Sequence, residues 1–128
     1  MILSNLIFWK KSNGRTLDFK TVAGRMKVGC CSIRFVLHGN RSLKDKRRVV
    51  STIKNRVKNK FNISVSEVGD QDERQRLHIG IAAVGGSGFN LDGLLNQVVD
   101  FIDAMGLAEM TDHQIKLINL GKATTETL

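Results

Sequence analysis

A dense run of basic side chains in the first half of the chain is the feature best suited to chemistry. Between residues 26 and 60, eleven Lys and Arg stand against one acid, Asp45. With so few acids, ion pairs inside this stretch cannot neutralise it. The mutual repulsion of cations crowded in this way is relieved when the phosphates of a nucleic acid replace their counterions. The residues predicted to contact phosphates are Arg41, Lys44, Arg47, Arg48, Lys54 and Lys58.

A second group of chemically capable side chains is acidic. Asp70, Asp72 and Glu73 stand just before Arg74 and Arg76, and carboxylates this close can bind Mg²⁺ or act as an acid–base pair. A solvated turn with mutually neutralising charges explains the pattern better. We therefore assign no catalytic residue and expect no enzyme. An activity at the Asp70–Arg76 turn is the alternative.

Patterns for metals and cofactors are weak. His38, His78 and His113 are far apart and lack ligand spacing, so no metal site is expected. The glycine-rich segment 85–88 precedes a predicted helix, where backbone N–H groups can hold a phosphate. It lacks the Lys-Ser/Thr ending of a P-loop, so a strand-to-helix turn is the better interpretation, and no cofactor is predicted.

The adjacent Cys30 and Cys31 point to opposite faces of a predicted strand and cannot easily pair. This indicates packing residues in a reducing, cytoplasmic setting. No apolar run approaches the ~20 residues that cross a bilayer, so no membrane partner is expected.

The elements that position these residues follow in regular order after Met26. Strands are predicted at 28–37, 63–68, 77–83 and 114–120, and helices at 42–61 and 91–105. Ser42 and Asn90 are suited to cap the two helices, and Gly106 to end the second. The order βαββαβ predicts an α+β, ferredoxin-like fold: a four-stranded antiparallel sheet with two helices on one face.

The other face of the sheet is predicted to be small-featured and partly apolar, either solvated or paired with a second copy as a homodimer. The residues expected there are Ser32, Arg34, His78, Gly80 and Ala82. Because this face offers no Phe, Tyr or Trp, it is not suited to stacking single-stranded bases.

Helical geometry separates the two sides of the first helix. At 100° per residue, an apolar arc faces the sheet and an adjoining arc carries the predicted phosphate contacts. The apolar arc holds Leu43, Val49, Val50, Ile53, Val57 and Phe61, and the opposite flank holds Lys46, Arg56 and Lys60. Shape-and-phosphate contact of this kind is typical of structured RNA.

The charge of the chain is unevenly distributed. Residues 1–25 carry +4, residues 26–60 carry +10 and residues 61–128 carry −6, within a net charge of +8. This favours a polyanionic partner, although charge that only keeps the protein soluble is the simpler alternative. Residues 1–25 lack a sustained pattern and are predicted to be a weakly ordered extension or a misassigned start. The ferredoxin-like domain is predicted at 26–121, with a frayed tail at 122–128.

The sequence resembles a known family. The runs 41–50 (RSLKDKRRVV) and 61–68 (FNISVSEV), with Gln71-Asp72 and Gln75-Arg76, are similar to the YlxP-like family of small bacterial proteins, domain of unknown function 503. The resemblance covers about residues 26–120. It implies a ferredoxin-like fold and genes that neighbour those of translation initiation and ribosome-binding factors. Arg74 and Gly69 depart from the family pattern, which often has an aromatic and an acidic residue there.

Together these observations predict an RNA-binding accessory protein of ribosome assembly or translation, with structured RNA, ribosomal RNA foremost, as the partner. The alternative is a self-associating protein-interaction module without a nucleic-acid role, in which the basic helix docks on an acidic protein.

Overall fold

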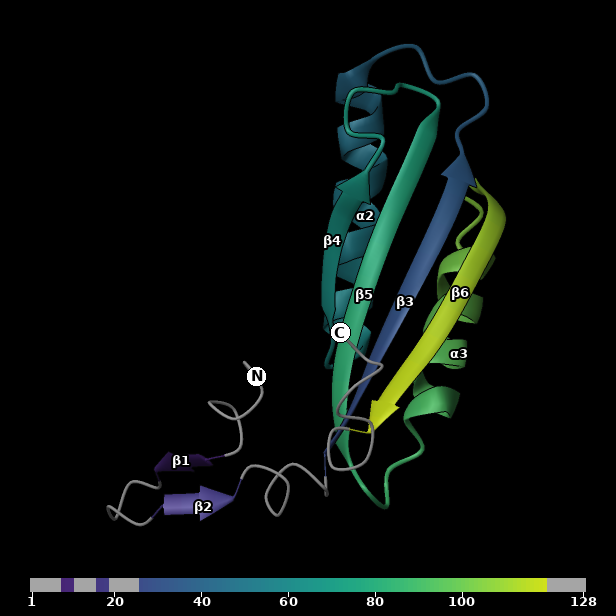
Figure 1. The fold of residues 1–128 in the computed structure, drawn as a ribbon. Coiled ribbons are helices and arrows are strands. Elements are labelled where there is room, and N and C mark those ends of the chain that lie inside the picture. The colour runs from purple at the N-terminus through teal and green to yellow at the C-terminus, as the bar shows by residue number, and fades with distance from the viewer. Residues whose placement is uncertain (1–7, 11–15, 19–25, 120–128) are drawn as a thin grey trace.

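Four strands and two helices form the main body of the chain (Figure 1). The computed structural model describes residues 8–10, 16–18 and 26–119. The strands are β3 (Met26–Val36), β4 (Ser64–Gly69), β5 (Arg76–Gly86) and β6 (Glu109–Asn119), and the helices are α2 (Leu43–Lys60) and α3 (Leu91–Ala104). Two short strands, β1 (Phe8–Lys10) and β2 (Thr16–Asp18), pair antiparallel in a sheet of their own.

The main sheet has the strand order β4-β5-β3-β6, and every neighbouring pair is antiparallel. Both helices lie on the same face of this sheet, and no described element covers the other face (Figure 1). This is the split βαβ arrangement of ferredoxin-like proteins. The predicted fold class is confirmed.

The core lies between the sheet and the helices. Cys31, Ile33 and Phe35 alternate along β3 and are all buried, as the two-residue period of a strand requires. Val57 of α2 and Leu95 of α3 meet them from the helix layer with no exposed surface. The central strands therefore fix the face that each helix turns inward.

The predicted helix caps are present. The Ser42 side chain accepts a hydrogen bond of 3.1 Å from the backbone N–H of Asp45, and the Asn90 Oδ1 accepts one of 3.0 Å from Gly93. These bonds satisfy backbone donors that have no partner inside the helix. Gly106 follows α3 with φ of 66°, a left-handed conformation that glycine adopts without a steric penalty.

Two predicted strand boundaries were wrong. Strand β5 continues through Gly86 because Gly85 and Gly86 pair with Lys27 and Met26 of β3, so the glycine-rich segment does not end the strand at residue 83. Strand β6 begins at Glu109, five residues before the predicted start. A bulge where β6 passes Arg34 and Phe35 shifts its register and breaks the alternation that marks a strand in the sequence.

The predictions for the chain ends are not tested. Apart from β1 and β2, residues 1–25 lie outside the described residues, as do residues 120–128. The predicted weak order of 1–25 and the predicted frayed tail at 122–128 therefore stay predictions.

Candidate nucleic-acid interface

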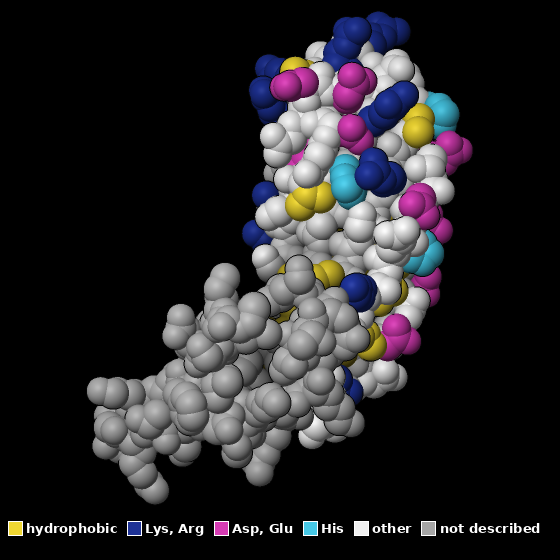
Figure 2. All heavy atoms as spheres, viewed as in Figure 1, with side chains coloured by type: hydrophobic (Ala, Val, Ile, Leu, Met, Phe, Trp, Pro, Cys, Tyr) yellow, Lys and Arg dark blue, Asp and Glu magenta, His cyan; other side chains and the backbone are white. Residues whose placement is uncertain are grey.

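Helix α2 turns most of its basic side chains to the surface. Of the six predicted phosphate contacts, Lys54 is half-buried and the other five are exposed: Arg41, Lys44, Arg47, Arg48 and Lys58. Among the described residues, none of the six takes part in an ion pair. In Figure 2, Lys and Arg side chains gather at the end of the molecule where α2 begins and along the edge next to β4. Their charge is open to a partner.

Three of these cations surround one hollow between α2 and β4. Arg47, Lys54 and Lys58 line it, with Ser51 and Asn55 between them, and its volume is about 300 Å³. Side chains three and four residues apart lie on the same helix face, which is why the helix brings these three together. Hydroxyl and amide groups beside three cations form a setting suited to an anionic oxygen.

The same hollow also contains an acid, Glu67 of β4. Its Oε2 atom lies 3.0 Å from the Nζ atom of Lys46 and forms an ion pair with it. The geometry of this contact is not that of a hydrogen bond. The Lys46 charge offsets that of Glu67, so the acid opposes an anion in the hollow only weakly.

The predicted position of Lys46, on the flank of the apolar arc, was wrong. Its side chain is only 2% exposed, and Nζ donates to the carbonyl oxygens of Asp70 and, at 2.8 Å, Glu73. At 100° per residue Lys46 falls between Ile53 and Val57, so it belongs to the buried arc and not to its flank. Its position within the apolar stripe was the signal that it is buried.

The turn between β4 and β5 packs on the start of α2. Asn40 Nδ2 donates to the carbonyl oxygen of Arg74 at 2.7 Å, and Arg74 Nη1 donates to that of Arg41 at 3.2 Å. Arg74 was not among the predicted contacts, yet it places a further exposed cation beside Arg41. A contact between two distant loops leaves no signal in a single sequence.

Among the acids of the predicted turn, Asp70 has a side-chain contact with a cation. Asp70 lies 4.0 Å from Arg34 and has a φ of 55°, while Asp72 and Glu73 are exposed. Within residues 26–119, no three His, Cys, Asp or Glu side chains converge to hold a metal. Neither described helix has the length and apolar character needed to cross a membrane.

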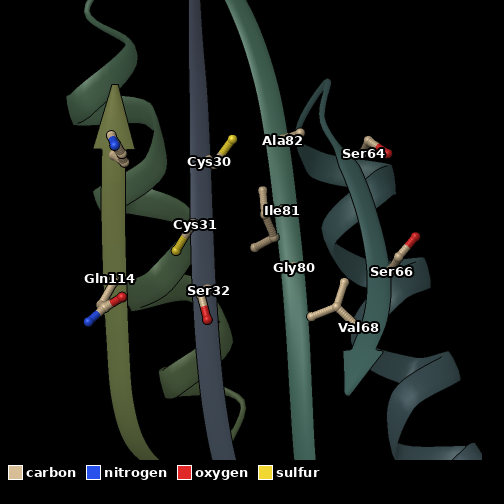
Figure 3. Close-up of a pocket in the computed structure, with 11 residues that line it drawn as sticks. Cys30, Cys31, Ser32, Ser64, Ser66, Val68, Gly80, Ile81, Ala82 and Gln114 are labelled. Carbon is tan, nitrogen blue, oxygen red and sulfur yellow. The ribbon is translucent and has the colours of Figure 1, made fainter. Parts of the chain in front are cut away.

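The open face of the sheet carries the small residues predicted for it. Ser32 pairs with Gly80, Arg34 with His78, and Cys30 with Ala82, and Ser32 Oγ lies 2.7 Å from His78 Nε2. Figure 3 shows Ser32, Cys30 and Ala82 around a shallow hollow of about 390 Å³.

The two cysteines differ as predicted. Cys31 is buried and Cys30 is exposed, and neither is in a disulfide. Burial raises the pKa of the Cys31 thiol to about 11, because the charged thiolate loses its hydration in the core.

These features define a class: a small ferredoxin-like α+β protein with one strongly basic helix. The sequence profile of a family described as "Protein of unknown function (DUF503)" matches residues 28–115, and the chain belongs to this family. It is 42% identical over 84 residues to the uncharacterized protein YlxP of Bacillus subtilis (strain 168). The match covers 66% of this chain and 91% of that relative, which confirms the YlxP-like resemblance.

A crystal structure of a putative chlorite dismutase shares a distant likeness. It aligns with a TM-score of 0.44 and 10% sequence identity, over 73% of this chain and 45% of that one. The chain thus spans less than half of that protein, and a likeness this low says nothing of activity.

Proposed function

We propose that the protein binds structured RNA through the basic face of α2, as a cytoplasmic accessory protein of ribosome assembly or translation. The observation that carries the proposal is the set of six cations on and before α2, none of which is paired with an acid within residues 26–119. Mutual repulsion among these cations falls when phosphates replace their counterions. The link to the ribosome rests on the family resemblance alone.

The geometry of α2 suits a phosphate backbone. A helix of 18 residues is about 27 Å long, so cations from Arg41 to Lys58 can meet several phosphates in succession. The hollow lined by Arg47, Lys54 and Lys58 offers one place where a phosphate would contact three cations. Contacts of this kind depend on the shape of the RNA and carry little sequence information.

The open face of the sheet is not suited to binding single-stranded RNA, which favours binding through the helix. Its described strands present no Phe, Tyr or Trp there, whereas proteins that bind single strands through a sheet stack bases on aromatic rings. A duplex or folded RNA along α2 is therefore a better ligand than a single strand on the sheet.

A matched pair of substitutions on α2 tests the proposal. Arg47 and Arg56 are both exposed and lie half a helical turn apart around the axis, so Arg47→Glu and Arg56→Glu change the charge equally on opposite sides. In fluorescence anisotropy with a ribosomal RNA fragment, we expect Arg47→Glu to weaken binding by about tenfold or more and to lower the salt slope by about 1. Arg56→Glu should stay within about threefold of wild type.

Equal losses in the two variants would contradict a defined face on α2. So would an affinity unaltered by Arg47→Glu combined with Arg48→Glu. A pull-down after nuclease treatment gives the competing outcome: an acidic protein retained without RNA would replace the RNA proposal with a protein-docking role for the same helix.

A further inference from the structure

The face of the sheet opposite the helices has a hollowed centre, and among the described residues Lys116 is the one charged side chain that lines this hollow. Gln114 and Lys116 of β6 line the hollow of about 390 Å³ together with small side chains of β3, β4 and β5: Cys30, Ser32, Ser64, Ser66, Gly80 and Ala82. A second hollow of about 390 Å³ adjoins it through Ser64 and Ala82. Figure 2 shows the charged side chains of this face gathered toward the β4–β5 turn, with a largely uncharged region beside them.

Aliphatic side chains border the hollows and remain open to solvent. Val68 is 54% exposed and Val84 is 62% exposed, and Figure 3 shows Val68 directed from β4 toward Gly80. A Cβ atom on Gly80 would lie 2.7 Å from the Val68 side chain, so glycine is what leaves room for it. The exposed valines project beside hollows lined by Gly, Ala and Ser. The valines of a second copy could therefore enter the hollows of the first.

We propose that this face pairs with the same face of a second copy of the chain, giving a two-fold symmetric dimer. A symmetric interface brings one patch against itself, and this patch offers both the ridges and the hollows that such contact needs. Nucleic acid is a poor occupant because, within residues 26–119, the lining of the two hollows has a single cation, Lys116, and no aromatic ring. The proposal goes beyond RNA binding and does not depend on it.

The area of the face is sufficient for a dimer. Strands β3, β5 and β6 have 11 residues each and β4 has 6. At about 16 Å² per residue, from the strand spacing and rise, the sheet covers roughly 600 Å². Two copies face to face would bury about 1,200 Å², which is the lower end of the range for stable interfaces.

Charges at one end of the face fit the rim of such an interface. Arg34 and Asp70 lie 4.0 Å apart there, and Asp112 of β6 stands opposite Arg34 of β3 in the strand register. Because both acidic and basic side chains stand at this end, charged side chains of a second copy would find groups of opposite charge. Interfaces typically have a centre depleted of charged residues and a polar rim. This face has that layout, with Lys116 as the one charged residue of the described chain that lines its central hollow.

The arrangement would leave α2 free. With the sheets facing each other, the helix layers of both copies point outward, and one dimer would present two basic helices. Binding to RNA would then be bivalent, and the apparent affinity of the dimer would exceed that of a single chain.

Light scattering after size-exclusion chromatography tests the dimer on the full chain. At roughly 100 µM, wild type should give twice the chain mass of 14.2 kDa, because an interface of this size is populated at such concentrations. Ala82→Glu, in the centre of the face, should give a monomer. Ala104→Glu makes the same change at an exposed position on α3 and should remain a dimer.

Labelling of Cys30 gives a second readout. Cys30 is exposed in the single chain, so its rate of alkylation should fall as the concentration of wild type rises and should stay constant in Ala82→Glu. A wild-type monomer at about 100 µM overturns the proposal, including the case in which residues 1–25 cover the face. Equal masses for Ala82→Glu and Ala104→Glu overturn it too. RNA affinity is measured separately with Arg47→Glu, so either proposal can fail alone.

Discussion

Lys46 places its side-chain amine between α2 and the turn that joins β4 to β5. Removing an ammonium group from water costs several kcal/mol, and the structure offsets this with two carbonyl acceptors and the Glu67 carboxylate. The lysine thereby fixes the turn that holds Arg74 beside Arg41. At the scale of single residues, it links the stability of the fold to the shape of the candidate interface.

Replacing Lys46 with methionine tests this role. Lys46→Met keeps the length of the side chain but leaves Glu67 without its partner, and we expect a loss of about 3–5 kcal/mol in the free energy of unfolding. Lys44→Met is the matched control, since Lys44 is exposed on the same helix and should change stability by less than about 0.5 kcal/mol. Urea unfolding measures both, and similar losses in the two variants would contradict the anchoring role.

Cys31 makes the stability of the protein depend on pH in the alkaline range. Burial raises its pKa from 9.0 to about 11, so above pH 9 the unfolded chain loses this proton before the folded chain does. The contribution of this shift to the free energy of unfolding is fully present below pH 9 and is lost as pH rises to 11, on the order of 3 kcal/mol in total. Cys31→Ala should therefore show a smaller decline in unfolding free energy between pH 9 and pH 11 than wild type, and an identical decline would contradict this account.

At the scale of elements, α3 packs close to β3 because Gly29 has no side chain. A Cβ atom there would lie 2.6 Å from Leu95 and 3.1 Å from both Leu91 and Leu117. The two helix leucines are buried and have little room to move.

We expect Gly29→Ala to lower the free energy of unfolding by about 1–3 kcal/mol through overpacking. Gly88→Ala, where a Cβ meets nothing within 4 Å, should leave it unchanged or slightly higher. Thermal unfolding of both variants checks this. A Gly29→Ala variant as stable as Gly88→Ala would mean that α3 can shift away from the sheet.

Most of the fold could be predicted from local patterns. Alternation marked β3 and the centre of β5, and the apolar stripe with its Ser42 cap marked α2, because these features repeat at the period of the element itself. The first half of strand β6 was not predicted, because its bulge places Met110 and Ile115 on the same face of the sheet although their positions in the sequence differ by an odd number. The extension of β5 through Gly86 was not predicted either, because Gly85 and Gly86 belong to a strand only through their pairing with β3.

The candidate interface was predictable in part for the same reason. Helical geometry places Arg47, Lys54 and Lys58 together, and the structure gathers them around one hollow. The contribution of Arg74 and the anchoring by Lys46 depend on contacts between segments some 30 residues apart. Such contacts follow from the tertiary fold and not from spacing.

At the scale of the whole molecule, the charges separate across the helix layer. Helix α2 is basic, whereas the exposed charged residues of α3 are all acidic: Asp92, Asp100 and Asp103. The field of the protein therefore points from one helix to the other. A polyanion approaching along α2 is attracted and one approaching along α3 is repelled, so the proposed RNA partner would be oriented before contact.

The salt dependence of RNA binding tests the central claim most directly. If the six cations contact phosphates, the logarithm of the association constant with ribosomal RNA should fall with the logarithm of salt concentration at a slope of about −4 to −5. Between about 50 and 200 mM salt, affinity should then drop by a few hundredfold to a thousandfold. A slope near zero, or no binding at the lower salt concentration, would contradict an RNA-binding role for α2.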